Sequence, residues 1–335
     1  MEDSFWGTYS QYREAPRIVC IGGGTGLSTM LRGLKRYTPN ITAIVSVSDD
    51  GGGSGVLREE LGMPPPGDIR ACILALSNVE PTLEELFNYR FTEGNLKGQS
   101  FGNLFIAAMN GISDSFDEAV QRVSSVLAIT GRVLPVTGEN VKLAAHLEDG
   151  SVIEGESKIF EAKRQHGCRI LNVSLSPEEP ETLPECVDAI EHADIIVLGP
   201  GSLYTSIIPC LLVRGIPEAI MRSTAVRLFV MNLMTQIGET EAYTAGDHIR
   251  AIFKHGRAPL VDYCIANNLP LHPQLLERYR EEGGQQIFTD PQELADMGVK
   301  VRLAPLAERG RGFVRHDTGL LAAEIMRVYE KVCGA

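Results

Sequence analysis

The sequence predicts an α/β fold, with a mainly parallel sheet, helices on both faces, and a small inserted β subdomain. Runs rich in β-branched residues alternate with helical patterns along most of the chain, which is typical of such sheets. Glycine-rich turns follow several predicted strands directly, at the strand ends where these folds bind ligands. The stretch Val141–Ser157 breaks the alternation with a turn signal between two short β patterns. We therefore expect a loose arm at residues 1–16 and one domain over 17–335, with a β excursion near 135–170.

The first two elements show the expected pattern clearly. The apolar run Arg17–Ile21 is a strand, and a helix follows because Leu27, Met30, Leu31 and Leu34 recur at the spacing of one helical face. The next elements are recognised from β-branched composition or from apolar segments after glycine-bearing loops. They are a strand at Ile41–Ser48 and helices at Asp68–Leu76, Leu104–Met109 and Glu118–Leu127.

After the inserted subdomain, Arg169–Ser174 is expected to return the chain to the main sheet. Strand and helix patterns then alternate again, which favours parallel pairing. The predicted strands are Asp194–Leu198, Val226–Met231, Leu260–Ile265 and Val299–Leu303, and the predicted helices are Gly246–Phe253 and Asp317–Val332.

Charge and hydrophobicity limit the partners of this chain. Its 335 residues include 31 basic and 43 acidic ones, a net charge of −12, so nucleic acid is not expected as a partner. No apolar run approaches the length of a membrane span, and residues 1–16 lack the apolar core of a secretory signal. The seven cysteines are scattered without a CxxC pair, which favours reduced thiols and a cytoplasmic location.

The first glycine box is Gly22-Gly23-Gly24-Thr25-Gly26, between a strand and a helix. Free backbone N–H groups and the positive end of a helix dipole meet at such a point, where a phosphate can bind. The glycine spacing differs from that of dinucleotide enzymes, and the chain has no Gly-Lys-Ser/Thr of a P-loop. Taken alone, the box fits a phosphate site and a tight turn equally well.

The second box, Asp49 to Gly55, follows the second predicted strand. Asp49 lies close to where a Rossmann fold places its ribose-binding carboxylate. Alternatively, Asp49 and Asp50 together could hold Mg²⁺ against a phosphate, since this cation binds few carboxylates plus ligand oxygens. A flexible acidic loop is the structural alternative.

Two further boxes open predicted helices. In Pro64-Pro65-Pro66-Gly67-Asp68-Ile69-Arg70, Asp68 is placed as an N-cap. Arg70 opposes the helix dipole, so it is expected to meet either an anionic ligand or a nearby carboxylate. Gly102 and Asn103 offer amides at the start of another helix, where ordinary capping is the simpler interpretation.

The last two boxes follow later strands. Gly199-Pro200-Gly201-Ser202-Leu203-Tyr204-Thr205 repeats the arrangement of strand, glycine turn and hydroxyl groups, and predicts a second phosphate or sugar site. Asn232, Thr235 and Gln236 follow another strand and could read a base or sugar by hydrogen bonds. His248 at the next helix is either an acid–base group or, more commonly for a lone histidine, a structural one.

In this order the boxes resemble the bacterial gluconeogenesis factor family (YvcK-like), which is related to the 2-phospho-L-lactate transferases (CofD-like) of deazaflavin cofactor synthesis. The motifs GGGTG, DDGG-S-G, PPPGDIR, S-GN, GPGSLYTS and N-MTQ-GET carry the resemblance between Pro16 and Phe253. It implies a three-layer α/β/α Rossmann-like fold. The glycine and serine run after Asp50 favours the YvcK-like branch, although Gly53 stands where a serine is expected.

The YvcK-like branch implies a cytoplasmic protein that binds UDP-sugars such as UDP-N-acetylglucosamine, with no assigned reaction. It would link gluconeogenic carbon metabolism to peptidoglycan synthesis and cell shape, with a homo-oligomer and envelope-synthesis regulators open as protein partners. The transferase branch implies transfer of a phospholactyl or phosphoenolpyruvyl group to a deazaflavin alcohol with release of GMP. Asp49 or Asp50 would then be catalytic and organise Mg²⁺. An NAD(P) oxidoreductase is disfavoured by the glycine spacing.

Both branches place the ligand against the same boxes. The residues expected to contact it are Gly22, Gly23, Gly24, Thr25, Gly26, Asp49, Asp50, Asp68, Arg70, Gly102, Asn103, Gly199, Gly201, Ser202, Leu203, Tyr204, Thr205, Asn232, Thr235 and Gln236.

Overall fold

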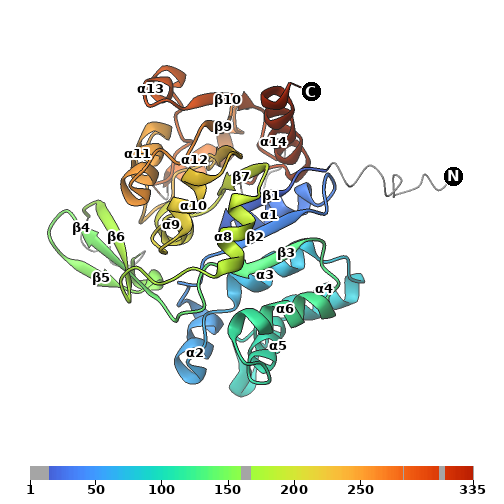
Figure 1. Ribbon diagram of the computed structural model, residues 1–335. Coiled ribbons are helices and arrows are strands. Elements are labelled where there is room, and N and C mark those ends of the chain that lie inside the picture. Colours follow the sequence, from blue (N-terminus) through green and yellow to red (C-terminus); the bar gives the residue numbers. More distant parts are fainter. Residues whose placement is uncertain (1–14, 160–166, 282, 309–313, 335) are drawn as a thin grey trace.

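A computed structural model describes residues 15–159, 167–281, 283–308 and 314–334, so most of the expected N-terminal arm lies outside the described residues. The main sheet has seven strands in the order β10-β9-β8-β7-β1-β2-β3, and every neighbouring pair is parallel (Figure 1). This confirms the predicted α/β fold. The strands are β1 (Ile18–Gly22), β2 (Ile41–Val45), β3 (Arg132–Pro135), β7 (Ile195–Leu198), β8 (Val226–Val230), β9 (Tyr263–Asn267) and β10 (Lys300–Ala304).

The central strands are apolar along their whole length because helices cover both faces of the sheet. Every residue of β1, β2 and β7 is buried, as expected for parallel strands between two helical layers. The edge strand β10 instead exposes alternate charged residues, Lys300 and Arg302. The core of the domain therefore lies around β1, and β1 positions the first glycine box.

One helical layer is centred on α1, which packs between α3 and α14. Gly33 of α1 has room for no side chain, because a Cβ there would clash with the backbone of Thr318 in α14. This layer contains α1 (Gly24–Leu34), α3 (Gly67–Leu76) and α14 (Thr318–Cys333). The helices drawn below α1 in Figure 1 include α2 (Gly52–Leu61), α4 (Pro81–Asn88), α5 (Phe101–Asn110) and α6 (Phe116–Val126), and the short 3₁₀ turn η2 (Gly94–Leu96) lies between α4 and α5 in the chain.

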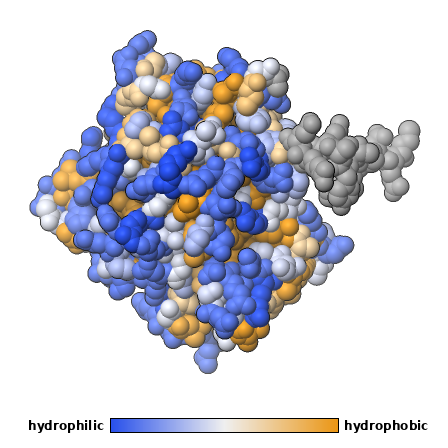
Figure 2. Space-filling view, viewed as in Figure 1, coloured by the Kyte–Doolittle hydropathy of each residue, from blue (hydrophilic) through white to orange (hydrophobic). Residues whose placement is uncertain are grey.

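The second layer is a series of shorter helices in mutual contact, from α8 through α10 and α9 to α11 and α13. None of the helices in the described residues is long and apolar enough to cross a membrane. On the face shown in Figure 2, apolar residues are scattered among hydrophilic ones. The elements are α8 (Pro184–Glu191), the π-helix η3 (Leu203–Ile207), α9 (Ile208–Leu211), α10 (Ile216–Arg222), α11 (Ala245–Gly256), α12 (Pro273–Glu281) and α13 (Pro291–Asp296).

The order of the strands reverses between β1 and β7. From β1 the chain moves outward through β2 to β3, and from β7 it moves the other way through β8 and β9 to β10. Because crossovers are right-handed, the connecting helices of the two halves cover opposite faces. The carboxyl ends of β1 and β7 thus form a switch point, where open α/β sheets bind ligands.

The predicted β excursion forms a separate antiparallel sheet of three strands in the order β5-β4-β6: β4 (Lys142–Leu147), β5 (Val152–Glu154) and β6 (Ile170–Ser176). The expectation that Arg169–Ser174 rejoins the main sheet is wrong, because this segment pairs with β4 and the chain re-enters the main sheet only at β7. The small sheet is fastened to α11, since the backbone N–H of Val173 donates to His255 Nε2 at 3.1 Å.

The region after β2 also differs from expectation. The glycine run Gly51–Gly55 is expected to be a loop, but α2 begins within it at Gly52. Glycine is a poor helix former, but at two of these positions a larger residue would not fit. A Cβ at Gly53 would lie 2.7 Å from the side-chain oxygen of Gln99, and one at Gly55 would clash with the backbone of Asp50.

Candidate functional site

An open cleft of about 750 Å³ lies at the switch point and is lined by both predicted glycine turns. Their backbones pack directly against each other. A Cβ at Gly26 would lie 2.5 Å from the carbonyl oxygen of Pro200, and one at Gly201 would lie 3.1 Å from the carbonyl oxygen of Gly23. Residues after β1 and residues after β7 therefore form one continuous wall of the cleft.

The first turn of α1 faces this wall. Its N-cap residue Gly23 has no side chain to cap the helix, and the first N–H groups of a helix have no partner within it. The Asp68 carboxylate accepts a hydrogen bond from the N–H of Gly24, while Thr25 and Gly26 line the cleft. A Cβ at Gly23 would clash with the Asp68 carboxylate, which would have to move away from the N–H of Gly24.

Asp68 itself is predicted to cap its own helix, and this prediction is wrong. The N-cap of α3 is Pro66, and Asp68 lies within the first turn of α3. From there its carboxylate reaches across to α1. Burial, and next the charge of Asp49, raise the pKa of Asp68 to about 7.

The second glycine turn is held by side chains from neighbouring loops. The side-chain amide of Asn232 makes two hydrogen bonds with the backbone of Gly201. Asn232 Oδ1 accepts from the Gly201 N–H at 3.1 Å, and Asn232 Nδ2 donates to the Gly201 carbonyl oxygen at 2.7 Å. Glu239 accepts from the Ser202 hydroxyl at 2.6 Å and from the Tyr204 N–H at 3.2 Å. Ser202 in turn caps the π-helix through the Thr205 N–H.

Among the described lining residues, acidic side chains outnumber lysine and arginine. Asp49 accepts from the N–H of Gly51 at 2.8 Å, and burial raises its pKa. Glu156 enters the cleft from the inserted subdomain and hydrogen-bonds Thr205; burial, and next the charge of Asp49, raise its pKa to about 9. With Asp68 and Glu239, four carboxyl groups of the described residues line the cleft.

Arg315 is the only lysine or arginine among the described lining residues, and it comes from the C-terminal segment together with His316. His316 is buried and donates from Nε2 to the carbonyl oxygen of Met231 at 3.1 Å. Burial lowers the pKa of His316 to about 4, so this imidazole is neutral at physiological pH. Tyr279 also lines the cleft, and its hydroxyl accepts a hydrogen bond from the N–H of Val314 in this segment at 3.2 Å.

The cleft brings together twelve of the twenty predicted contact residues: Gly23, Gly24, Thr25, Gly26, Asp49, Asp68, Gly201, Ser202, Thr205, Asn232, Thr235 and Gln236. The other eight do not line it: Gly22, Asp50, Arg70, Gly102, Asn103, Gly199, Leu203 and Tyr204.

Several of the eight have identifiable structural partners. Gly22 and Gly199 end neighbouring strands with positive φ angles of 153° and 71°. The Arg70 guanidinium donates to the amide oxygens of Asn103 and Asn88, each at 2.9 Å. For Arg70 the structure thus offers two amide partners, where an anionic ligand or a carboxylate was expected.

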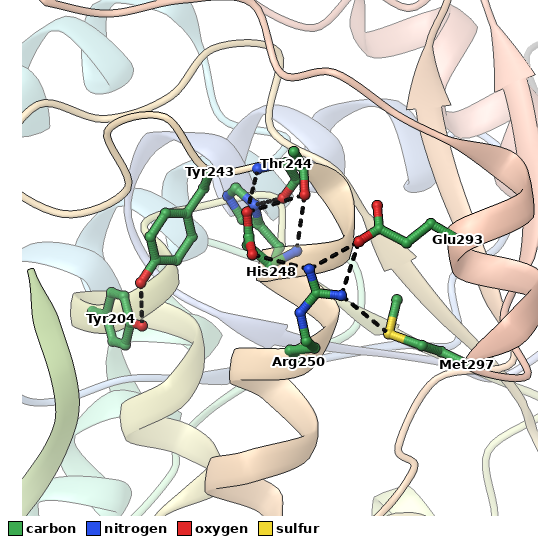
Figure 3. A network of polar contacts seen from close by, with 8 residues as sticks. Tyr204, Tyr243, Thr244, His248, Arg250, Glu293 and Met297 are labelled. Carbon is green, nitrogen blue, oxygen red and sulfur yellow. Dashed lines mark hydrogen bonds and ion pairs between the residues drawn. The ribbon is translucent and has the colours of Figure 1, made fainter.

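Tyr204 is buried and belongs to a network of polar contacts, shown in Figure 3, that also includes the half-exposed Arg250. Its hydroxyl lies 2.9 Å from that of Tyr243. Next to Tyr243, His248 Nδ1 lies 2.8 Å from the carbonyl oxygen of Thr244, the N-cap of α11. Burial lowers the pKa of His248, and the residue does not line the cleft. Of the two interpretations of His248, the structural one fits this position.

Sequence reasoning missed several lining residues. Glu156 lies in the inserted subdomain and Arg315 far along the chain, and neither belongs to a glycine box. Glu239 had a usable signal, because it stands in the Gly-Glu-Thr segment that follows the sixth box. In the described residues, no group of three or more His, Cys, Asp or Glu is arranged to hold a metal ion.

The fold and the cleft define an α/β protein whose two glycine turns meet at the switch point of a parallel sheet. The chain belongs to the family described as 2-phospho-L-lactate transferase CofD, whose family model matches residues 18–307.

Within this family, the chain is similar to proteins named gluconeogenesis factor. The chain is 46% identical over 311 residues to the gluconeogenesis factor of Bacillus subtilis, covering 92% of this chain and 97% of that protein. It is 47% identical over 283 residues to the gluconeogenesis factor of Halalkalibacterium halodurans, covering 84% and 87% of the two chains. The crystal structure of a UPF0052 family member from Bacillus halodurans matches with a TM-score of 0.89 at 42% identity, over 93% of this chain and 99% of that one. The resemblance found in the sequence is confirmed.

Proposed function

We propose that the cleft binds a nucleotide-sugar of the UDP-N-acetylglucosamine type and that the protein acts in the cytoplasm as a regulator without catalysis of its own. It would link gluconeogenic carbon metabolism to peptidoglycan synthesis and cell shape. The observation that carries the proposal is the direct packing of the two glycine turns around the first turn of α1. Backbone N–H groups at such a point suit a diphosphate.

The carboxyl groups of the cleft favour a ligand rich in hydroxyl groups. Four of them line it among the described residues, and carboxyl oxygens accept hydrogen bonds from sugar and ribose hydroxyls in either protonation state. The anionic part of the ligand would meet the N–H groups of Thr25 and Gly26 and the guanidinium of Arg315. A volume of about 750 Å³ lies in the usual range for small-molecule sites.

Calorimetric titration with UDP-N-acetylglucosamine, GDP and NAD, each with and without Mg²⁺, tests the proposal. We expect saturable binding of the UDP-sugar and no turnover over hours of incubation. Tight binding of GDP together with GMP release from a guanylyl-phospholactate donor would overturn it in favour of a transferase. Preferential binding of NAD would overturn it as well.

A further inference from the structure

The two adjacent carboxylates after β2 face different ways. Asp49 and Gly51 line the cleft, whereas Asp50, which stands between them in the chain, does not. The Asp50 carboxylate instead accepts a hydrogen bond from the backbone N–H of Ser157 at 2.8 Å. Ser157 belongs to the inserted subdomain and is separated from Asp50 by 107 positions in the sequence.

The hydrogen bond from Ser157 to Asp50 caps the start of a helical segment. Residues 156–159 are helical and begin directly after Gly155, and the first N–H groups of a helical segment need an acceptor. Gly155 has no side chain that could supply one, and its φ angle of 107° is one that other residues rarely adopt. A Cβ at Gly155 would also lie 2.5 Å from Asp50 Oδ2. Asp50 therefore caps a turn whose own cap residue must be glycine.

The capped turn carries part of the cleft. Glu156 and Ser157 both line it, and Glu156 also hydrogen-bonds Thr205 beyond the second glycine turn. The segment is thus held on one side by the loop after β2 and on the other by the loop after β7. Both oxygens of Asp50 lie against this segment, one bonded to Ser157 and one close to Gly155. This arrangement does not fit a paired magnesium site at Asp49 and Asp50.

We propose that Asp50 is a positioning residue that holds the turn 155–157 over the cleft, so that the inserted three-stranded sheet supplies one wall of the ligand site. This inference rests on the proposed function for the identity of the ligand. The hydrogen bond from Ser157 and the close approach of Gly155 carry it, and Asp50 acts on the ligand only through Glu156 and Ser157.

Replacement of Asp50 by asparagine or by alanine separates this role from a charge or metal role. The asparagine side chain keeps an oxygen that can accept from Ser157, whereas the alanine side chain does not. We expect D50N to bind UDP-N-acetylglucosamine within about threefold of the wild type, and D50A to bind roughly five- to tenfold more weakly, the usual cost of a lost cap. Both ratios should be the same with and without Mg²⁺. D49N serves as the control for the hydrogen-exchange measurement, because Asp49 is the neighbouring carboxylate and accepts from Gly51.

Amide hydrogen exchange of the segment 155–158 gives a second readout that needs no ligand. Exchange at Ser157 should be faster in D50A, near the wild-type rate in D50N, and unchanged in D49N. The inference is overturned if D50N loses as much affinity as D50A, or if exchange at Ser157 is the same in D50A as in the wild type. If the wild type binds no UDP-sugar, the proposed function fails, and the exchange rates still decide whether Asp50 caps the turn.

Discussion

Replacing Gly26 by alanine should push the two glycine turns apart. A Cβ at this residue would lie 2.5 Å from the carbonyl oxygen of Pro200, whereas ordinary contacts begin at 3.4 Å, so a separation of about 0.9 Å is required. The contact is between backbones and cannot be relieved by a side-chain rotation. Overpacking of this kind costs about 1–3 kcal/mol, which lowers the melting temperature by roughly 1.5–4.5 °C in a domain of this size.

The same displacement should weaken ligand binding. Positioning errors near 1 Å can cost up to about 100-fold, so we expect the Kd for UDP-N-acetylglucosamine to rise at least about tenfold, which corresponds to about 1.4 kcal/mol. Isothermal titration calorimetry measures the Kd and differential scanning fluorimetry the melting temperature. Gly319→Ala is the matched control, because its Cβ would meet nothing closer than 3.5 Å in the first turn of α14. A folded Gly26→Ala protein with wild-type Kd would refute the reasoning that the turns form one site.

Three further predictions concern the pH dependence of binding and the stability of the fold. Glu156 has a pKa of about 9, so its carboxyl group is neutral at pH 7.5 and becomes an anion as the pH rises through 9. Affinity for an anionic nucleotide-sugar should fall between pH 7.5 and 9.5 in the wild type and stay level in Glu156→Gln; equal slopes in calorimetry at each pH would contradict this. Gly33→Ala should lower the free energy of unfolding in urea by about 1–3 kcal/mol, because α1 and α14 touch there, and an unchanged midpoint would count against that close contact. Tyr204→Phe removes the 2.9 Å hydrogen bond to Tyr243 and should cost about 1 kcal/mol in the same assay; a wild-type midpoint would mean that the bond adds no net stability.

The elements beside the first glycine box could be predicted because their signals are local. A buried apolar strand, a glycine turn and a helix with apolar periodicity follow one another within Ile18–Leu34. The position of the cleft also followed from the sequence, since parallel strands place the residues after them at one edge. The start of α2 could not be predicted, because its glycines are poor helix formers and nothing in the local sequence shows that larger side chains at Gly53 and Gly55 would clash with Gln99 and Asp50.

The partners of individual carboxylates could not be predicted from the sequence, because these partners are distant in the chain. Asp49 and Asp50 are adjacent in the chain, yet one faces the cleft and the other caps a turn 107 positions away. Asp68 likewise bonds a helix other than its own. Neither partner leaves a periodic or spaced signal near the carboxylate. The same holds for Glu156 and Arg315, which reach the cleft through tertiary structure alone.

The contact between Gly26 and Pro200 has a consequence for how the protein acquires its ligand during folding. The two residues belong to opposite halves of the sheet, so the ribosome must complete more than half of the chain before a binding surface can exist. Non-local contacts of this kind form late and slowly. A ligand that binds only the assembled cleft stabilises the whole domain, by about 2.7 kcal/mol at a concentration of 100 times its Kd. Cellular abundance of the protein would then rise and fall with the supply of its own ligand.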